Sequence, residues 1–335
     1  MPYLECRNLR RVFHHFTLDI SLSVEKGELM CILGPSGSGK STLLGAISGT
    51  DSSVSGQILL DGEDITGMPI RKRRIGMVFQ DFSLFPSMNV EKNIRYGMRD
   101  VPESEKHAET ERLLEMVDLA GYGSRSVHEL SGGEAQRIAL IRAVAAKPRM
   151  LLLDEPLSAL DAPLRKKLRT IIRQIHDRTG ITMLYVTHDR EEAFAIADRI
   201  MIMRGGRLED IGTPEELYRH PSNLFTAFFT GEGSAVPMSC VDGKASDKVL
   251  FFRPEDAEIN REGSSENHFI LEKACIESHE YTGSGYLVRL AYKDRSVLAM
   301  SKEKPAPSGA GSSVSVYIPR DRTVILDQDQ GFSVG

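Results

Sequence analysis

The residues of this 335-residue chain that are best suited to do chemistry lie at positions 34 to 42, which read GPSGSGKST. Glycines let the backbone bend tightly, so several N–H groups can point inward at an anion. The spacing fits G-x-x-x-x-G-K-[ST], in which the lysine faces the outer phosphates of a nucleotide and the hydroxyl coordinates Mg²⁺. The pattern predicts a phosphate site, and the alternative is a glycine-rich turn that binds nothing. The residues expected to contact the phosphates are Gly34, Pro35, Ser36, Gly37, Ser38, Gly39, Lys40, Ser41 and Thr42.

The segments around this loop predict the elements that must position it. The apolar run 29–33 precedes the loop and STLLGAISG follows it with helical spacing, so the phosphate would lie at a helix N-terminus. Residues 1 to about 230 alternate strand-like runs, such as RMLLLDE and ITMLYVTH, with helical segments such as 162–178. This alternation predicts an α/β domain with a mostly parallel sheet and helices packed around it.

The pattern changes after residue 235. Short strand-like runs such as KVLFFRPED and GYLVRLAYK are separated there by turns rich in Gly, Ser, Asp and Asn, which predicts a small all-β barrel or sandwich. The stretch LYRHPSNLFTAFFTGEGSAVP ends in Gly, Ser and Pro and indicates a boundary. We therefore expect two domains, a nucleotide-binding domain at 1–232 and a β domain at 235–335.

Composition limits the classes of partner. The net charge of −5 gives no overall attraction to nucleic acid, so no nucleic-acid partner is expected. No apolar run is long enough to span a bilayer, and the start MPYLECRNLRR lacks the apolar core of a signal peptide. The four cysteines contain no C-x-x-C pair, which argues against a zinc site or a disulfide framework and favours reduced thiols in a cytoplasmic protein.

A second group of candidate residues ends the strand-like run RMLLLDEP. A carboxylate at a strand end beside a phosphate loop can hold the magnesium shell, which is the role expected of Asp154. Glu155 would then lie near the terminal phosphate and orient or deprotonate a water for in-line attack. The alternative is a solvated Asp-Glu turn after a strand.

A third group lies in ELSGGEAQRIALIRAVAAKP at 129–148. Ser131 is a plausible helix N-cap, and Gly132 and Gly133 leave backbone N–H groups exposed at the positive helix end. This is a second anion site, and one nucleotide does not need two complete ones. A two-fold dimer, in which each chain presents this helix end to the nucleotide of its partner, explains both sites. The alternative is a glycine-rich turn before a core helix.

Together, these motifs resemble the nucleotide-binding subunit of an ABC transporter. LSGGE at 130–134 is similar to the family signature, in which glutamine is usual at the last place, so Glu134 departs from the pattern. The resemblance covers residues 1 to about 230. It implies a P-loop NTPase fold and ATP hydrolysis with Mg²⁺ by a homodimer that clamps two ATP molecules. The departure at Glu134 concerns the contact to the partner's nucleotide sugar.

The resemblance also assigns roles to residues outside these motifs. Phe13 matches the aromatic residue that stacks on adenine, with Phe16 as a nearby rival. Gln80 matches the glutamine that senses magnesium and couples to the membrane subunits, and His188 in YVTHD matches the histidine that contacts the γ-phosphate. The resemblance implies metal contacts from Ser41, Gln80 and Asp154, catalysis by Glu155 and His188, and contacts across the dimer from Ser131, Gly132, Gly133, Glu134 and Asp161.

The C-terminal part resembles a different element of the same family. FFRPEDAEI at 251–259 is similar to the R-P-E segment of the OB-like (TOBE) domain appended to ATPases of binding-protein-dependent importers. Within this segment we expect Arg253 and Glu255 to form a structural ion pair. The resemblance implies an importer with separate permease subunits and, indirectly, a solute-binding protein. It places the chain on the cytoplasmic face of the membrane, with iron(III), a polyamine or an inorganic oxyanion as cargo. The alternatives are an exporter or lipoprotein-release ATPase and a non-transport ABC ATPase.

Overall fold

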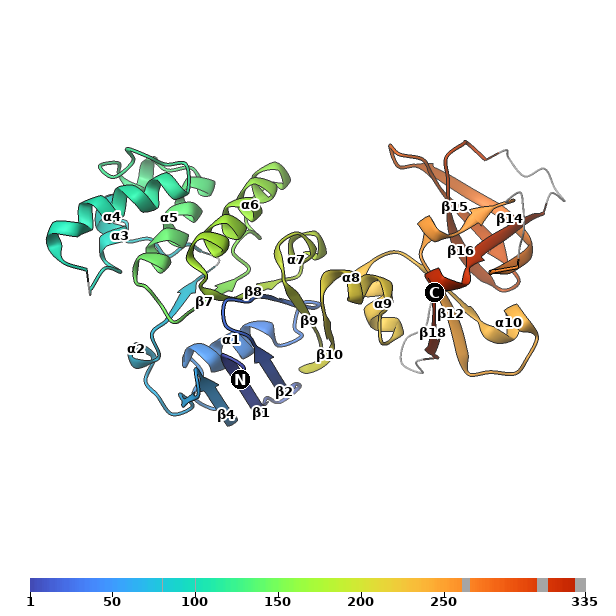
Figure 1. Ribbon diagram of the computed structural model, residues 1–335, viewed down its shortest axis with the longest axis horizontal. Coiled ribbons are helices and arrows are strands. Elements are labelled where there is room, and N and C mark those ends of the chain that lie inside the picture. The colour runs from blue at the N-terminus through green and yellow to red at the C-terminus, as the bar shows by residue number, and fades with distance from the viewer. Residues whose placement is uncertain (80, 100, 261–265, 306–312, 329–335) are drawn as a thin grey trace. The chain divides into compact units, whose positions relative to one another are not determined.

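The computed structural model describes the chain except residues 80, 100, 261–265, 306–312 and 329–335 (Figure 1). The described chain divides into two compact units, Met1–Pro214 and Glu215–Gly335. This division falls earlier than the boundary that the sequence pattern indicated. The reason is that the helix at Leu224–Thr230 packs through Leu224 and Ala227 against Phe251 and Leu326 of the second unit.

Among the described residues, the first unit contains a sheet of six strands. The strands β3, β6, β7, β8 and β9 pair in parallel, and β10 joins the edge antiparallel to β9. The strands β3 and β8 are buried along their whole length, as expected for strands covered on both faces. In spatial order the strands are β10 (Arg207–Gly212), β9 (Arg199–Arg204), β3 (Leu29–Leu33), β8 (Thr182–Thr187), β7 (Met150–Asp154) and β6 (Ile75–Val78).

An antiparallel sheet forms a further layer of this unit, and it went unnoticed in the sequence. The helix α1 (Lys40–Ser48) lies between the two sheets, and its apolar side chains share one core with both (Figure 1). The run TLDISLSV alternates buried and exposed residues, which is the period-2 signal of a half-buried strand. The strands are β2 (Thr17–Val24), β1 (Leu4–Val12), β4 (Ser55–Leu60) and β5 (Glu63–Asp64).

Local capping explains where the longer helices begin and end. Asp161 accepts a hydrogen bond from the N–H of Leu164 at the start of α6 (Ala162–Thr179), and Gly180 ends that helix in the left-handed conformation. Ser131 and Glu134 form a capping box at the start of α5. The remaining helices of this unit are α2 (Ile70–Arg73), α3 (Val90–Arg95), α4 (Glu103–Met116), α5 (Gly132–Ala145) and α7 (Arg190–Ile196).

The second unit is built on two antiparallel sheets. The core is formed by alternate apolar residues of both sheets, such as Leu250, Leu271, Val288 and Val316. The expected fold class, an α/β phosphate-loop domain followed by a small all-β domain, is confirmed. The strands are β11 (Ser234–Pro237), β12 (Lys248–Phe252) and β18 (Thr323–Asp327) in one sheet, and β13 (Glu258–Ile259), β17 (Val314–Pro319), β14 (His268–Tyr281), β15 (Tyr286–Tyr292) and β16 (Arg295–Ser301) in the other; the helices are α8 (Pro214–Arg219), α9 (Leu224–Thr230) and α10 (Met238–Asp242).

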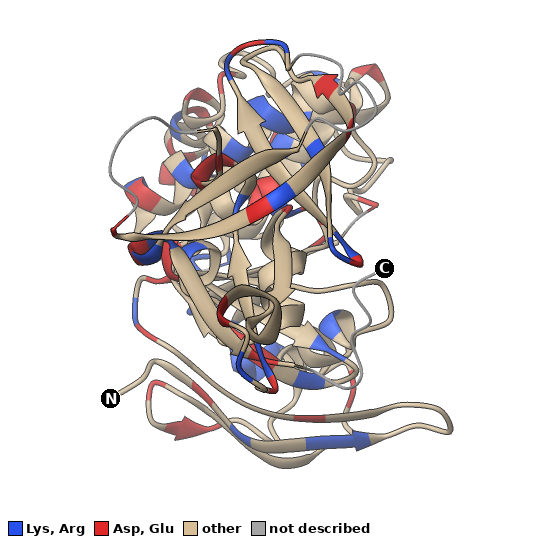
Figure 2. Ribbon diagram, turned by 90° about the vertical axis from the view of Figure 1, so that its right-hand side faces the viewer, with Lys and Arg blue, Asp and Glu red and all other residues tan. Residues whose placement is uncertain are grey.

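Charge and length of the elements bear on the surroundings of the chain. Acidic and basic residues are interspersed along the ribbon (Figure 2), in keeping with 42 basic and 47 acidic side chains in the sequence. Within the part of the chain that the structure describes, no helix combines the length and the apolar character needed to cross a bilayer.

The arginine of the R-P-E segment is buried and links several segments of the second unit through hydrogen bonds. Arg253 is 3% exposed, and its guanidinium donates to the backbone oxygens of Tyr218, Ala227 and Glu232. The expected structural role agrees with these contacts, although they are mostly to carbonyl oxygens rather than to an acid. Glu255 accepts a hydrogen bond from the hydroxyl of Tyr218 at 2.6 Å, so the two residues meet at the same tyrosine.

We expect Arg253→Leu to destabilise this unit by about 3 kcal/mol or more, because several buried carbonyl oxygens would lose their donor. Hydrogen exchange of peptides from β12 and β18 measures that loss. As a control, Arg289→Leu on the exposed side of β15 removes one bond to Ser296 of 3.3 Å and should change stability by less than about 0.5 kcal/mol. Equal effects of the two substitutions would contradict a tying role for Arg253.

Candidate active site

The phosphate loop joins β3 to α1 and curls around the side chain of Lys40. The Nζ of Lys40 donates to the carbonyl oxygens of Gly34 at 2.9 Å and Pro35 at 3.0 Å, and the side chain is 5% exposed. Gly37 and Gly39 have φ angles of +78° and +98°, a region that residues with a side chain rarely adopt. The sequence of this loop therefore has glycine at the two positions where the backbone turns most sharply.

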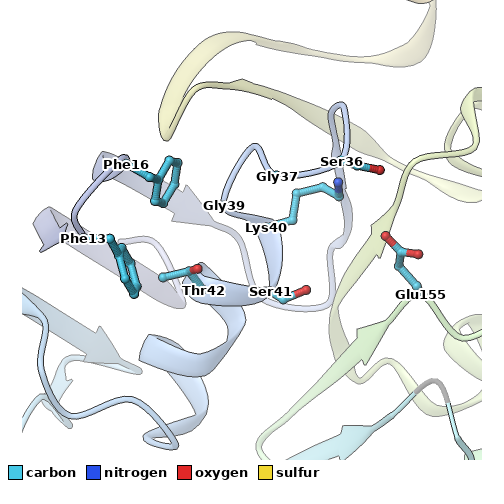
Figure 3. Close-up of a pocket in the computed structure, with 9 residues that line it drawn as sticks. All are labelled: Phe13, Phe16, Ser36, Gly37, Gly39, Lys40, Ser41, Thr42 and Glu155. Carbon is cyan, nitrogen blue, oxygen red and sulfur yellow. The ribbon is translucent and has the colours of Figure 1, made fainter.

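The loop lines a cavity of about 330 Å³ whose wall is completed by residues from elsewhere in the first unit (Figure 3). The carboxylate of Glu155 lies across this cavity from Lys40 and Ser41. Burial lowers the pKa of Lys40, and the nearby charges of Glu155 and Asp154 oppose that shift. The oxygen Oγ of Ser38 is buried without a hydrogen-bond partner in the described structure. The cavity thus combines a buried cation and a carboxylate around a glycine loop, and the loop also holds the buried hydroxyl of Ser38.

The residues present fit a magnesium ion beside this loop. The hydroxyl of Ser41 donates to Oδ1 of Asp154 at 3.1 Å, which brings two oxygens of the kind that Mg²⁺ prefers together. Burial raises the pKa of Asp154, and the neighbouring charge of Glu155 raises it further. Among the described residues, no group of three or more His, Cys, Asp or Glu side chains is arranged as a metal site. Gln80, the third expected ligand, lies outside the described residues.

Two candidate catalytic residues meet at the ends of neighbouring strands. Glu155 directly follows β7, and His188 directly follows β8; the Nδ1 of His188 lies 3.1 Å from Oε2 of Glu155. Glu155 has a φ of +43°, a conformation that is costly for a residue with a side chain and that occurs mainly where the surroundings impose it. Its N–H donates to the carbonyl oxygen of Val186, which holds this backbone against β8.

Both candidate aromatic residues line the cavity, but their surroundings differ. A Cβ added to Gly39 or to Gly206 would come within 2.5 Å or 2.9 Å of the Phe16 ring, so Phe16 is wedged between two glycines. Phe13 is 41% exposed, and the guanidinium of Arg11 lies 4.6 Å from the centre of its ring. These surroundings favour Phe13 as the residue that can stack on a planar ligand.

The signature residues do not line this cavity. Ser131 and Gly132 are exposed at the N-terminus of α5, and Glu134 accepts bonds from the N–H and the hydroxyl of Ser131 at 2.8 Å and 2.7 Å. A Cβ on Gly133 would come within 2.7 Å of Leu164, so glycine allows α5 to pack closely on α6. Asp161 is also exposed and caps α6. The structure thus brings together the phosphate loop, Asp154, Glu155 and His188, and leaves the signature residues and Asp161 outside that cavity.

A buried group near His188 was missed in the sequence. Glu192 is 3% exposed and accepts hydrogen bonds from the hydroxyls of Tyr185 and Thr187. The sequence signal was an acid on the side of α7 that also carries the buried Ala193 and Ile196. An acid inside an apolar core normally requires hydrogen-bond partners, so an acid at such a position indicates a specific buried hydrogen bond.

A phosphate loop before a helix, and two acids at the end of a parallel strand, define a P-loop nucleotide-binding protein. Comparisons with known proteins identify the family within this class. Residues 17–158 match the family model described as ABC transporter. The chain is 38% identical to the Fe(3+) ions import ATP-binding protein FbpC of Photorhabdus laumondii, over 98% of this chain and 99% of that protein. It is 43% identical to the sulfate/thiosulfate import ATP-binding protein CysA of Synechocystis, over 75% of each chain. The chain belongs to the ABC transporter family, as its motifs predicted.

Proposed function

We propose that this chain is the ATP-hydrolysing subunit of an ABC importer and powers the uptake of a small solute through separate permease subunits. The observation that carries the proposal is the cavity shared by the phosphate loop and Glu155, with Asp154 bonded to Ser41 and His188 within 3.1 Å of Glu155 beside it. The names of the relatives, which are import ATP-binding proteins, support an importer over an exporter or a non-transport ATPase.

We assign these residues the following parts in hydrolysis. Lys40 and the N–H groups of the loop hold the β- and γ-phosphates of ATP. Ser41 and Asp154, together with Gln80, would hold Mg²⁺, which when bound neutralises charge on the phosphate oxygens. Glu155 accepts the proton of the attacking water, and His188 orients that water and contacts the γ-phosphate. No covalent intermediate is needed.

We infer that the catalytic unit is a homodimer. In it, the exposed N-terminus of α5 from one chain, with Ser131, Gly132 and Gly133, would close over the ATP of the other chain and add hydrogen-bond donors to its γ-phosphate. Asp161 would lie near the seam. The exposure of Ser131, Gly132 and Asp161, and the fact that none of them lines the cavity of their own chain, support this arrangement. Because Ser131 here donates to Glu134, the serine would have to exchange that carboxylate for the phosphate when the dimer closes.

The contact to adenine provides a test within the cavity. We expect Phe13→Ala to raise the KM for ATP by about 5- to 150-fold, because stacking of a base on an aromatic ring contributes about 1–3 kcal/mol. Phe13→Tyr keeps the ring and should keep the KM. Phe16→Ala should instead lower the melting temperature, since its ring fills the space between Gly39 and Gly206. A raised KM from Phe16→Ala with an unchanged one from Phe13→Ala would reverse the assignment.

The cargo and the location follow from the family rather than from the cavity. We propose iron(III), a polyamine or an inorganic oxyanion as the transported solute, since relatives are named for Fe(3+) and for sulfate and thiosulfate import. The chain would be peripheral to the cytoplasmic face of the membrane. The exposed side chain of Phe79 and the neighbouring loop 82–86 would contact the permease.

Affinity capture of the tagged chain from its native membranes, followed by mass spectrometry, tests the importer assignment. We expect a multi-span permease, with a solute-binding protein recovered through it. The ligand of that binding protein then identifies the cargo. Recovery of ribosomal or DNA-associated proteins without a membrane protein would contradict a transport function.

A further inference from the structure

The strand end that carries His188 is tied to a buried carboxylate with no part in the chemistry above. The Oε2 of Glu192 accepts hydrogen bonds from the Tyr185 hydroxyl at 2.7 Å and from the Thr187 hydroxyl at 2.9 Å. The two donors are alternate residues of β8 and lie on the same face of that strand. Glu192 therefore links the helix α7 to the last three residues of the strand that ends directly before His188.

The strand held in this way is central to the site. The strand β8 lies between β3, which leads into the phosphate loop, and β7, which leads into Asp154 and Glu155. Tyr185 is fully buried and Thr187 is 2% exposed. A shift at the end of β8 would therefore change the position of His188 relative to Glu155, whereas the phosphate loop is also held by the bonds of Lys40 to the carbonyl oxygens of Gly34 and Pro35.

The residue on the other side of His188 belongs to the same network. The N–H of Asp189 donates to Oγ1 of Thr187 at 2.9 Å, and the N–H of Glu192 donates to Oδ1 of Asp189 at 3.2 Å. The other oxygen of Asp189 pairs with Arg165 of α6 at 3.0 Å. Both neighbours of His188 are thus fixed, whereas the side chain of His188 itself is 52% exposed and can move toward a ligand.

We propose that Glu192 is a positioning residue for ATP hydrolysis: through the Thr187 hydroxyl it fixes the backbone that carries His188 and so sets the distance between His188 and Glu155. The proposal rests on the roles of His188 and Glu155 in the proposed function. A misplacement of about 1 Å at a reacting group can lower a rate about 10²-fold. Loss of Glu192 therefore lowers kcat, while the KM for ATP stays nearly constant because the phosphate loop is unchanged.

Substitutions at both ends of this contact test the proposal. Glu192→Ala, which removes the acceptor, should lower kcat by about tenfold or more with the KM within about twofold. Glu192→Gln keeps an acceptor oxygen in a site where burial already raises the pKa of the acid, so it should retain kcat within about threefold. Thr187→Val should match Glu192→Ala, and Thr187→Ser should restore the rate. The Thr187 pair keeps the test informative even if Glu192→Ala does not fold.

A matched control separates positioning from general loss of stability. Thr182, at the other end of β8, is 2% exposed and accepts a hydrogen bond from the N–H of Gly27 at 2.8 Å. Thr182→Val should lower the melting temperature as Thr187→Val does, yet keep kcat. Equal kcat values for Thr187→Val, Thr187→Ser and Thr182→Val would overturn the positioning role of Glu192 and leave the proposed function standing. Full turnover in His188→Ala would overturn the role of His188 in the proposed function and this proposal with it.

Discussion

Replacement of Glu155 by glutamine should lower ATP turnover by about 10²- to 10⁴-fold while ATP remains bound. Glutamine has nearly the same shape as glutamate but cannot take the proton of the attacking water. The phosphate loop and Lys40 are unchanged, so two ATP molecules should stay clamped and the protein should accumulate as an ATP-bound dimer. Phosphate release measures the first effect, and light scattering with Mg²⁺ and ATP measures the second.

The neighbouring acid Glu191 offers a control for this substitution. Its side chain is 85% exposed on α7, so Glu191→Gln removes a charge from the same region without touching the cavity. This variant should hydrolyse ATP at the rate of the unmodified chain. Normal turnover in Glu155→Gln would show that a different group activates the water.

Replacement of Lys40 by alanine should weaken ATP binding by about 10- to 150-fold, and turnover should fall with it. Hydrogen bonds to a charged group contribute about 1.5–3 kcal/mol each, which corresponds to this change in Kd. The carbonyl oxygens of Gly34 and Pro35 would also lose the donor that holds the loop in shape. Equilibrium titration with a fluorescent ATP analogue measures the affinity.

An exposed lysine provides the comparison for Lys40. Lys72 lies on the surface in α2, so Lys72→Ala should leave the affinity for ATP unchanged. A Lys40→Ala protein that bound ATP as tightly as Lys72→Ala would mean that the loop holds the phosphates through its backbone alone.

Local sequence signals were sufficient for the phosphate loop and for several elements around it. Glycine at the two left-handed positions, an apolar strand before the loop and a helical pattern after it are all short-range features. The same holds for α6, which was expected at 162–178 and spans Ala162–Thr179, because its cap and its terminating glycine are adjacent in sequence. The domain order followed from the change in pattern after residue 235.

Contacts that depend on how separate elements pack against each other could not be predicted in this way. The burial of Glu192 becomes evident once β8 and α7 pack together, since an acid on a helix is normally solvated. From the sequence alone Arg253 would likewise be taken for a surface cation. In the structure it binds the carbonyl oxygen of Ala227, which lies 26 residues earlier in the chain. The unusual φ of Glu155 depends on the register of β7 against β8, which no local pattern specifies.

A mixing experiment tests most directly the central claim, which is that each ATP site is built from two chains. Glu155→Gln lacks the base but keeps the signature, whereas Ser131→Arg lacks the signature but keeps the base, so each should be inactive alone. In equal mixture, half of the dimers would contain one intact site, and phosphate release should return to about a quarter of the normal rate. A mixture as inactive as its components, or a Ser131→Arg protein that is active alone, would contradict the claim.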